Sequence, residues 1–252
     1  MRKFSFEEKL IVLQSVTSTN NYAISIIAEK HPPEGTIIWA LEQTSGKGTG
    51  GNKWHSEPLK NLTFSIILYP KFLHIENEFF ISKIISLAVT DFMINFINNV
   101  KIKWPNDIYI NDSKIGGLLI ENLISNGIIT TSVIGIGLNI NQTAFPPDLQ
   151  NACSLIQFKK YEYDLNLMLK QLYYCIIDRY EQLKRQEFNE ITYEYLKRIY
   201  RMNFESRFIS NGKEFNGRIV NIENDGKLVV FDENGHYKKF NFKEIEFVIK
   251  FL

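Results

Sequence analysis

The stretch KWPNDIYINDSKIGGLLIE, residues 103–121, sets the fold class of this chain because it holds consecutive short strands separated by turn residues. Lys101–Trp104, Asp107–Ile110 and Lys114–Glu121 are rich in apolar and β-branched residues, which predicts three strands. Asn111-Asp112 is a turn signal between the second and the third. We therefore expect a β-rich region around residue 110.

Lys114 is the most unusual residue of this stretch. It opens a strand that is otherwise apolar or glycine as far as Ile120, so it is either exposed at the strand end or held there for a purpose. Gly116-Gly117 inside a strand indicates close approach by a ligand or by another backbone. Pro105, Asn106 and Asp107 are turn formers, and a simple hairpin would explain them.

Hydrophobic patterning predicts further elements on both sides of this stretch. A helix is expected to begin at the capping residues Ser18-Thr19-Asn20, to run to about Lys30, and to be stopped by His31-Pro32-Pro33. The remaining expected strands are Ile11–Val16, Thr36–Leu41, Leu62–Tyr69 and Ile128–Ile140; the remaining expected helices are Glu76–Phe96 and two between Asn166 and Arg201.

The C-terminal part has a different pattern. From Glu205 onward the segments are short and strand-like, and Asn211-Gly212, Asp225-Gly226 and Asn234-Gly235 separate them at roughly even spacing. That pattern is typical of a small antiparallel barrel. We place a domain boundary near Phe204, which gives a domain of residues 1–203 and a small domain of residues 204–252.

A glycine-rich stretch, SGKGTGGNKW from Ser45 to Trp54, is the first candidate for anion binding, because glycine lets backbone N–H groups approach phosphate oxygens. The P-loop pattern does not fit, since Leu41 stands where the first glycine should be and Gly48 follows Lys47. A surface loop is the plain alternative. GIGLNIN, residues 135–141, also leaves space beside a buried strand, and packing explains it as well as a ligand does.

Composition excludes several classes of protein. The 252 residues carry a net charge of +1, so the chain lacks the positive excess of a nucleic-acid binder. The N-terminus lacks the apolar run of a signal peptide and no segment is long and apolar enough to span a membrane, so we expect a cytoplasmic protein. Cys153 and Cys175 are expected to be reduced and buried, and the four histidines, at the surface, show no metal-ligand spacing.

The motifs taken in order resemble the biotin protein ligases. The resemblance rests on STN (18–20), EQTSGKGTGGNKWHSEP (42–58), NLTFSIIL (61–68), KWPNDIYINDSKIGGLLIE (103–121) and GIGLNIN (135–141). It is strong over about residues 10–145, and the C-terminal pattern is compatible with it. The order and spacing of the whole set are more specific than any single motif.

The resemblance implies an α+β fold, with a mixed β-sheet flanked by helices as in class II synthetases and lipoate ligases, followed by a C-terminal SH3-like barrel. Some members carry an N-terminal DNA-binding domain that represses transcription. Here the catalytic part begins within the first dozen residues, so we expect a stand-alone ligase that binds neither DNA nor membrane. Members occur as monomers and as homodimers, and the sequence does not choose between them.

The reaction implied by the resemblance has two steps. ATP adenylates biotin to biotinyl-5′-AMP, with Mg²⁺ carried on the ATP phosphates and no metal ligands in the protein. A lysine of a biotin carboxyl carrier protein, or of the carrier domain of a carboxylase, then takes the biotinyl group. Lys114 matches the lysine that contacts the biotin carboxylate and the α-phosphate. Asp107 matches the aspartate that orients or deprotonates the acceptor lysine.

The resemblance assigns the other site residues to two ligands. Those expected to bind biotin, besides Lys114, are Ser18, Thr19, Asn20, Gln43, Lys47, Gly48, Thr49 and Gly116; those expected to bind ATP or the adenylate are Gly46, Lys47, Trp54, Asn106 and Asn139. Ser18 and Thr19 are also good helix caps. Trp54 could instead belong to the core.

One departure concerns the loop, which commonly reads Gly-Arg-Gly-Arg-x-Gly-Arg in the family and here reads GKGTGGN, residues 46–52. Lysine and threonine do not reproduce the bidentate grip of arginine on phosphate, so we expect weaker retention of the adenylate. Lipoate–protein ligase is the nearest alternative function. A catalytically inactive module that binds biotin or the carrier is the alternative from another class.

Overall fold

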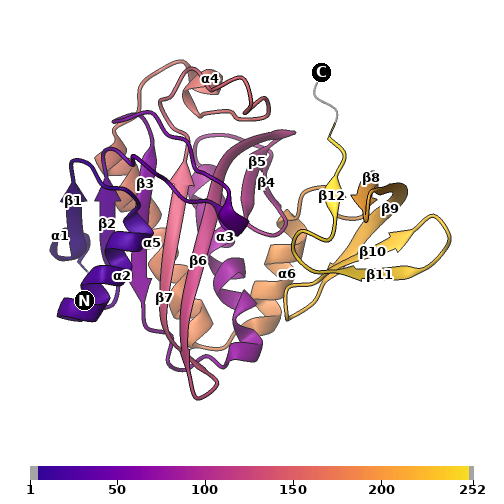
Figure 1. Ribbon diagram of the computed structural model, residues 1–252, viewed down its shortest axis with the longest axis horizontal. Coiled ribbons are helices and arrows are strands. Elements are labelled where there is room, and N and C mark those ends of the chain that lie inside the picture. Colours follow the sequence, from indigo (N-terminus) through magenta and orange to yellow (C-terminus); the bar gives the residue numbers. More distant parts are fainter. Residues whose placement is uncertain (1–4, 250–252) are drawn as a thin grey trace.

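A computed structural model describes residues 5–249, which form two β-sheets and their covering helices (Figure 1). The larger sheet has seven strands in the order β1-β2-β3-β7-β6-β5-β4, and its pairs are antiparallel except for the parallel pair β1–β2. Its strands are β1 (Leu10–Leu13), β2 (Thr36–Ala40), β3 (Leu62–Leu68), β4 (Val100–Lys103), β5 (Asp107–Ile110), β6 (Ser113–Ser125) and β7 (Ile128–Leu138).

Alternation along the strands explains the layers on the two faces of this sheet. Ile38 and Ile67 pack under α2 (Thr19–Lys30) with Ala23 of that helix. Their neighbours along the strands, Ile37 and Ile66, belong to the larger core on the opposite face. That core is covered by α3 (Phe79–Met93), α5 (Leu165–Lys184) and α6 (Phe188–Arg198) (Figure 1).

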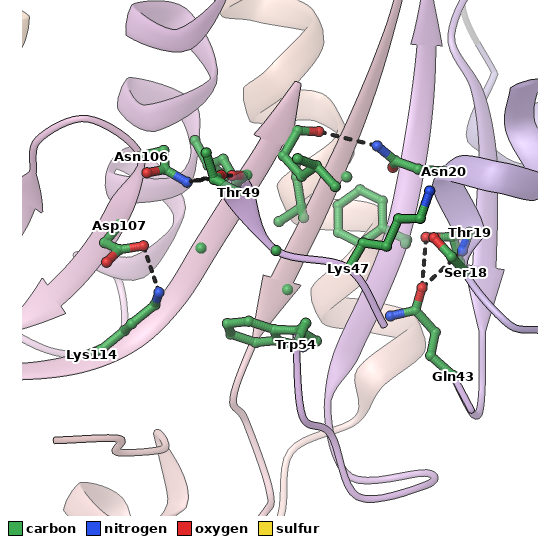
Figure 2. Close-up of a pocket in the computed structure, with 18 residues that line it drawn as sticks. Ser18, Thr19, Asn20, Gln43, Lys47, Thr49, Trp54, Asn106, Asp107 and Lys114 are labelled. Atoms are coloured by element: carbon green, nitrogen blue, oxygen red, sulfur yellow. Dashed lines mark hydrogen bonds and ion pairs between the residues drawn. The ribbon is translucent and has the colours of Figure 1, made fainter. Parts of the chain in front are cut away.

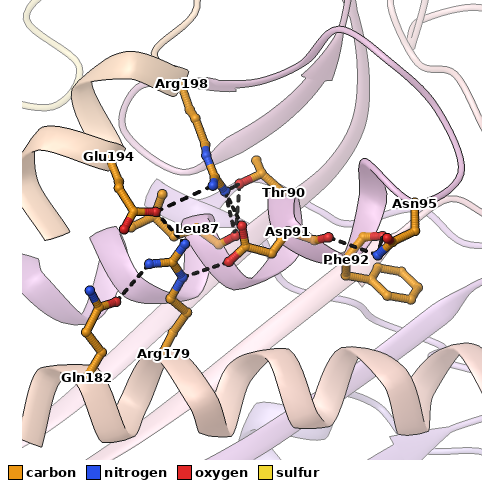
Figure 3. Close-up of polar contacts among 9 residues, drawn as sticks. All are labelled: Leu87, Thr90, Asp91, Phe92, Asn95, Arg179, Gln182, Glu194 and Arg198. Atoms are coloured by element: carbon orange, nitrogen blue, oxygen red, sulfur yellow. Dashed lines mark hydrogen bonds and ion pairs between the residues drawn. The ribbon is translucent and has the colours of Figure 1, made fainter. Parts of the chain in front are cut away.

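The helical layer contains a network of ion pairs and one buried lysine. Asp91 accepts from Arg179 Nε at 2.7 Å and from Arg198 at 2.6 Å, and Glu194 accepts from Arg179 at 2.6 Å, which ties α3, α5 and α6 together (Figure 3). Lys83 of α3 is fully buried and donates to Thr192 Oγ1 at 3.0 Å. Burial lowers the pKa of Lys83 to about 8.

The smaller sheet is five-stranded and antiparallel throughout, as expected for an SH3-like barrel. Its order is β11-β10-β9-β8-β12, with β8 (Glu205–Ser210), β9 (Lys213–Ile222), β10 (Leu228–Asp232), β11 (Tyr237–Phe240) and β12 (Glu246–Phe247). We call it the C-terminal sheet. Trp104 Nε1 donates to Gly226 O at 2.8 Å and so joins the end of β4 to it. Since α6 ends at Arg198 and β8 begins at Glu205, we propose to divide the chain between residues 203 and 204.

The expected elements are present with shifted ends. The first strand stops at Leu13 rather than Val16, and the strand that opens at Lys114 continues to Ser125. The long helix starts at Phe79, after a 3₁₀ turn at Ile75–Asn77, and ends at Met93. Hydrophobic patterning did not predict three short segments, because each is too short to show a repeat of buried residues: α1 (Phe6–Lys9), α4 (Ile156–Lys159) and η1 (Thr49–Gly51).

Other expectations concern single residues. All four histidines are exposed, as predicted. Both cysteines are free; Cys153 is buried, whereas Cys175 is only half-buried, because the far side of α5 faces solvent. Burial raises the pKa of Cys153 to about 12, so this thiol stays protonated at neutral pH. Within residues 5–249, none of the helices combines the length and the apolar character needed to span a membrane.

Candidate active site

A pocket lies on the α2 face of the large sheet, beneath the glycine-rich loop of residues 45–54 (Figure 2). Eleven of the fourteen predicted site residues line it, with seven further residues. The lining is Ser18, Thr19, Asn20, Gln43, Lys47, Gly48, Thr49, Trp54, Phe64, Asn106, Asp107, Lys114, Gly117, Leu118, Leu119, Gly135, Ile136 and Gly137. Figure 2 places Ser18, Thr19, Asn20 and Gln43, with Lys47 beside them, at one end and the ion pair of Lys114 and Asp107 at the other.

The neutral end is built at the start of α2. Gln43 Oε1 accepts from the backbone N of Thr19 at 2.8 Å and lies 3.1 Å from its hydroxyl. Ser65 Oγ lies 2.7 Å from Thr19 Oγ1 and 2.6 Å from Asn20 Oδ1. Ser18 occupies the N-cap position but its side chain makes no capping hydrogen bond, so its hydroxyl is not used by the helix. This end presents fixed hydroxyl and amide groups, with the ammonium of Lys47, held by Asn21, beside them.

Asn20 is held from three sides. Its Oδ1 meets Ser65, while its Nδ2 donates to Glu121 Oε2 at 2.7 Å and to Leu119 O at 3.3 Å. A Cβ on Gly135 would lie 2.5 Å from Asn20 Oδ1, so the glycine leaves the space that this side chain fills. Glu121 and Ser65, which sequence analysis did not single out, therefore orient a predicted ligand-binding residue.

Two further glycines shape the pocket. A Cβ on Gly137 would lie 2.3 Å from the indole of Trp54, so the ring lies flat against the β7 backbone. Gly117, not Gly116, faces the pocket: its Cβ would meet Asp107 and Lys114 at 3.4 and 3.5 Å. Gly116 points away, toward Leu138. The tryptophan is thus a wall of the pocket rather than a core residue.

The charged end depends on an irregularity in β6. Tyr109 pairs with Lys114 and Ile108 with Gly116, so Ile115 is an extra residue in the ladder, a β-bulge. In a regular strand, residues three apart face opposite sides; the bulge brings Lys114 to the same side as Gly117. Lys114 Nζ there lies 2.6 Å from Asp107 Oδ1, and both side chains keep partial exposure.

A second lysine lies beside this pair. The ammonium group of Lys103, on β4, lies 5.4 Å from the ring centroid of Tyr109 and 4.8 Å from that of Phe247 in the C-terminal sheet. Burial lowers the pKa of Lys103, and the nearby Asp107 opposes that shift. The charged end thus combines two cations with one carboxylate, which suits a site where anionic groups accumulate.

Thr49 and Asn106 fix the loop to the sheet, and Lys47 joins it to α2. Asn106 Nδ2 donates to Thr49 Oγ1 and to Leu118 O, both at 2.6 Å, and Thr49 Oγ1 donates to Leu118 O at 3.1 Å. Lys47 Nζ donates to Asn21 Oδ1 at 2.5 Å. Thr49 is therefore used to hold the loop against β6.

Three predicted residues lie outside the lining. Gly46 forms the base of the loop, where Trp54 N donates to its carbonyl, and Gly116 packs on β7. Asn139 is buried and donates to Cys153 O at 3.0 Å. Within the described residues, Asn139 Oδ1 and Trp54 Nε1 have no hydrogen-bond partner, so each keeps one polar atom available.

The residues that sequence analysis missed are mostly apolar: Phe64, Leu118, Leu119 and Ile136, with Gly135 and Gly137. GIGLNIN had drawn attention to the two glycines of β7. Strand alternation gave no way to tell which apolar side chains face a ligand. Phe64, Leu118 and Ile136 belong to the core on the far face of the sheet. On the pocket side, Trp54, Gly137 and Leu119 form a short apolar channel between the two ends.

The sequence around this site is similar to a known protein family. The model of the Biotin/lipoate A/B protein ligase family matches residues 12–139, just over half of the chain. The chain belongs to this family. The matched region contains every lining residue of the pocket.

Members with curated names are moderately similar to this ligase-family protein. It is 28% identical over 240 residues to the bifunctional ligase/repressor BirA of Bacillus spizizenii, covering 94% of this chain and 73% of that protein. It is 26% identical over 168 residues to the biotin–[acetyl-CoA-carboxylase] ligase of Mycobacterium tuberculosis, covering 65% and 61%. A solved biotin protein ligase of Aquifex aeolicus, in complex with biotin and ATP, superposes with a TM-score of 0.79 at 25% identity, covering 96% of this chain and all of that one.

Proposed function

We propose that this protein is a biotin protein ligase, which adenylates biotin with ATP and transfers the biotinyl group to a lysine of a biotin carrier protein. The observation that carries the proposal is the order of chemistry along the pocket. Fixed neutral donors and acceptors lie at one end, an apolar channel follows, and the Lys114–Asp107 pair lies at the other end. Biotin has the same order: a neutral ureido ring, an apolar chain and a carboxylate.

The neutral end suits the ureido group, because that group both donates and accepts hydrogen bonds and carries no charge. Ser18, Thr19 and Gln43 offer groups of both kinds from buried or half-buried positions. A site built to satisfy such a group rejects analogues that lack it, since its own buried polar atoms would lose their partners. The ring of lipoate has no ureido group, so this end favours biotin.

In the first step an oxygen of the biotin carboxylate attacks the α-phosphorus of ATP, and the bond to pyrophosphate breaks. Two anions approach each other, so a fixed cation lowers the barrier. Lys114 supplies that cation where the apolar channel ends. Because Asp107 already holds its ammonium at 2.6 Å, the incoming anions share Lys114 with this carboxylate.

Mg²⁺ is expected to arrive with ATP. Among the residues that the structure describes, no group of three His, Cys, Asp or Glu could hold a metal ion. Mg²⁺ is commonly bound through substrate phosphates and few protein groups. Trp54 and Asn139, each with a free polar atom, are the residues proposed to face the nucleotide.

In the second step the amine of the acceptor lysine attacks the carbonyl carbon of the mixed anhydride, AMP leaves, and the amine gives up a proton. The amine arrives protonated, since the usual pKa of lysine is about 10.4. Asp107 is the carboxylate at this end of the pocket and is proposed to take that proton or orient the amine. The loop keeps water from the anhydride while it waits.

The test is biotin-dependent exchange of labelled pyrophosphate into ATP, with lipoate as the parallel substrate. We expect exchange with biotin and none with lipoate. Lys114→Ala should lose exchange, whereas Lys60→Ala, which removes a lysine paired with Glu162 outside the pocket, should keep it. Exchange with lipoate alone would transfer the protein to the other branch of its family, and biotin binding without exchange would make it a binding module.

A further inference from the structure

The C-terminal sheet makes a direct contact with the glycine-rich loop. Lys243 Nζ donates to the carbonyl oxygen of Gly50 at 2.6 Å, across 193 positions in sequence. Lys243 lies in the turn between β11 and β12, which is closed by Asn241 and Glu244: the backbone N of Asn241 donates to Glu244 Oε2 at 2.6 Å. The loop above the pocket is therefore joined to a second structural unit.

The contact includes the aliphatic stem of the lysine. A Cβ on Gly50 would lie 2.2 Å from Lys243 Cε and 3.3 Å from a ring carbon of Phe242, so no side chain fits between them. Gly50 also has a φ of +68°, a conformation that favours glycine. The turn of residues 241–244 thus lies directly on the loop backbone at this point.

The backbone of Lys243 is unfavourable for the residue it carries. Its φ is +69°, in the left-handed region where glycine or asparagine is preferred. A non-glycine residue stays in that region when its surroundings hold it there, and such positions often have a functional reason. The side chain of Lys243 is exposed except for its contact with Gly50. This contact with the loop therefore accounts for the left-handed backbone at Lys243.

We propose that Lys243 is a positioning residue that holds the glycine-rich loop closed over the pocket. This rests on the proposed function, in which the loop covers the adenylate. Thr49 is fixed to β6 through Leu118 O and Asn106, and Gly50 is fixed from the other side by Lys243. The short turn Thr49–Gly51 is thereby held between the two sheets.

The experiment measures the loop itself, without ligand. Amide hydrogen exchange followed by mass spectrometry reports opening of residues 45–54, where Gly48 N donates to Asn52 O at 2.7 Å. Lys243→Gly removes the side chain and relieves the backbone. We expect exchange of the loop peptide to become about three- to tenfold faster, the range for the loss of one ordinary hydrogen bond. Lys243→Arg should restore protection, and the β3 peptide should not change.

The matched control is Asn211→Gly. Asn211 has a φ of +50° in the β8–β9 turn of the same sheet, so its substitution relieves a similar conformation without touching the loop. Loop exchange in Lys243→Gly no faster than in Asn211→Gly would overturn the proposal. A lower thermal midpoint with equal acceleration of all peptides would also overturn it, because it would show general loosening.

A second readout links the clamp to the reaction. Release of biotinyl-5′-AMP, chased with unlabelled biotin and ATP, should be about three- to tenfold faster from Lys243→Gly than from Asn211→Gly. If the proposed function fails, no adenylate forms in any variant, yet the hydrogen-exchange result still decides on the clamp. Faster loop exchange with unchanged adenylate release would contradict the role in retention.

Discussion

Gly135→Ala should damage the biotin site by displacing Asn20. The added methyl group would lie 2.5 Å from Asn20 Oδ1, while ordinary van der Waals contact begins at 3.4 Å, so the amide must move by about 1 Å. Asn20 cannot move that far and keep its bonds to Ser65 and Glu121, which are 2.6 and 2.7 Å long. The damage is therefore confined to Asn20 and its hydrogen-bond partners.

The expected magnitude follows from three contributions. Overpacking in a well-filled interior costs about 1–3 kcal/mol. Loss of the Ser65 and Glu121 hydrogen bonds adds about 1 kcal/mol each, and the lower entropy of the unfolded chain with alanine returns about 0.4–1 kcal/mol. We expect the free energy of unfolding to fall by about 2–5 kcal/mol and biotin affinity to fall at least about tenfold, because the start of α2 shifts with Asn20.

Urea unfolding and isothermal titration with biotin measure both quantities. Asn20→Ala provides the control, since it makes room for the methyl group. In the double variant, adding Gly135→Ala should cost less than about 0.5 kcal/mol beyond Asn20→Ala alone. Stability losses that simply add in the double variant would refute the reasoning, as would a Gly135→Ala protein with unchanged biotin affinity.

Three more predictions follow from contacts in other parts of the molecule. Burial lowers the pKa of Lys83 to about 8 from its usual 10.5. Between pH 8 and pH 10.5 the unfolded chain therefore binds more protons than the folded one. The free energy of unfolding should rise as the pH increases through this range. Lys83→Met should remove this rise and gain about 1–3 kcal/mol at pH 7, and a less stable variant in urea unfolding would contradict it. Asp107→Asn should slow transfer to the carrier about 10²- to 10⁴-fold in single-turnover assays, and an unchanged transfer rate would exclude Asp107 as base. Asp91→Ala should lower the free energy of unfolding by about 1–3 kcal/mol, because it leaves Arg179 and Arg198 without their shared carboxylate; a stability change below about 0.5 kcal/mol would show that this network contributes little.

Local chemistry predicted most of the fold. Asn111, predicted in a turn, has left-handed backbone between β5 and β6, and the helix expected at Glu76–Phe96 is present as α3, Phe79–Met93. Strand and helix ends were less accurate, because they depend on which neighbours are available. Val16, expected in the first strand, forms only an isolated bridge with Gln43.

The site was harder to predict than the fold, for a physical reason. Alternation would place Lys114 and Gly117 on opposite faces, and only the bulge at Ile115 brings them together. The residues that hold Asn20 come from β3 and β6, 45 and 101 positions away. No local pattern signals such contacts, so Ser65 and Glu121 could be found only in three dimensions.

The large sheet consists of two groups of strands joined at one strand pairing, and the pocket lies across that pairing. Residues Leu62–Leu68 of β3 pair with residues Ser132–Leu138 of β7. This pairing joins an N-terminal half of the sheet, strands β1 to β3, to a later half, strands β4 to β7. The neutral end of the pocket belongs to the first half and the ion pair to the second. Neither half alone contains a site, and a molecule bound in the pocket bridges both. Such a ligand joins the two halves in addition to the β3–β7 pairing, so a chain split within residues 70–78 should reassemble more readily when its substrate is present.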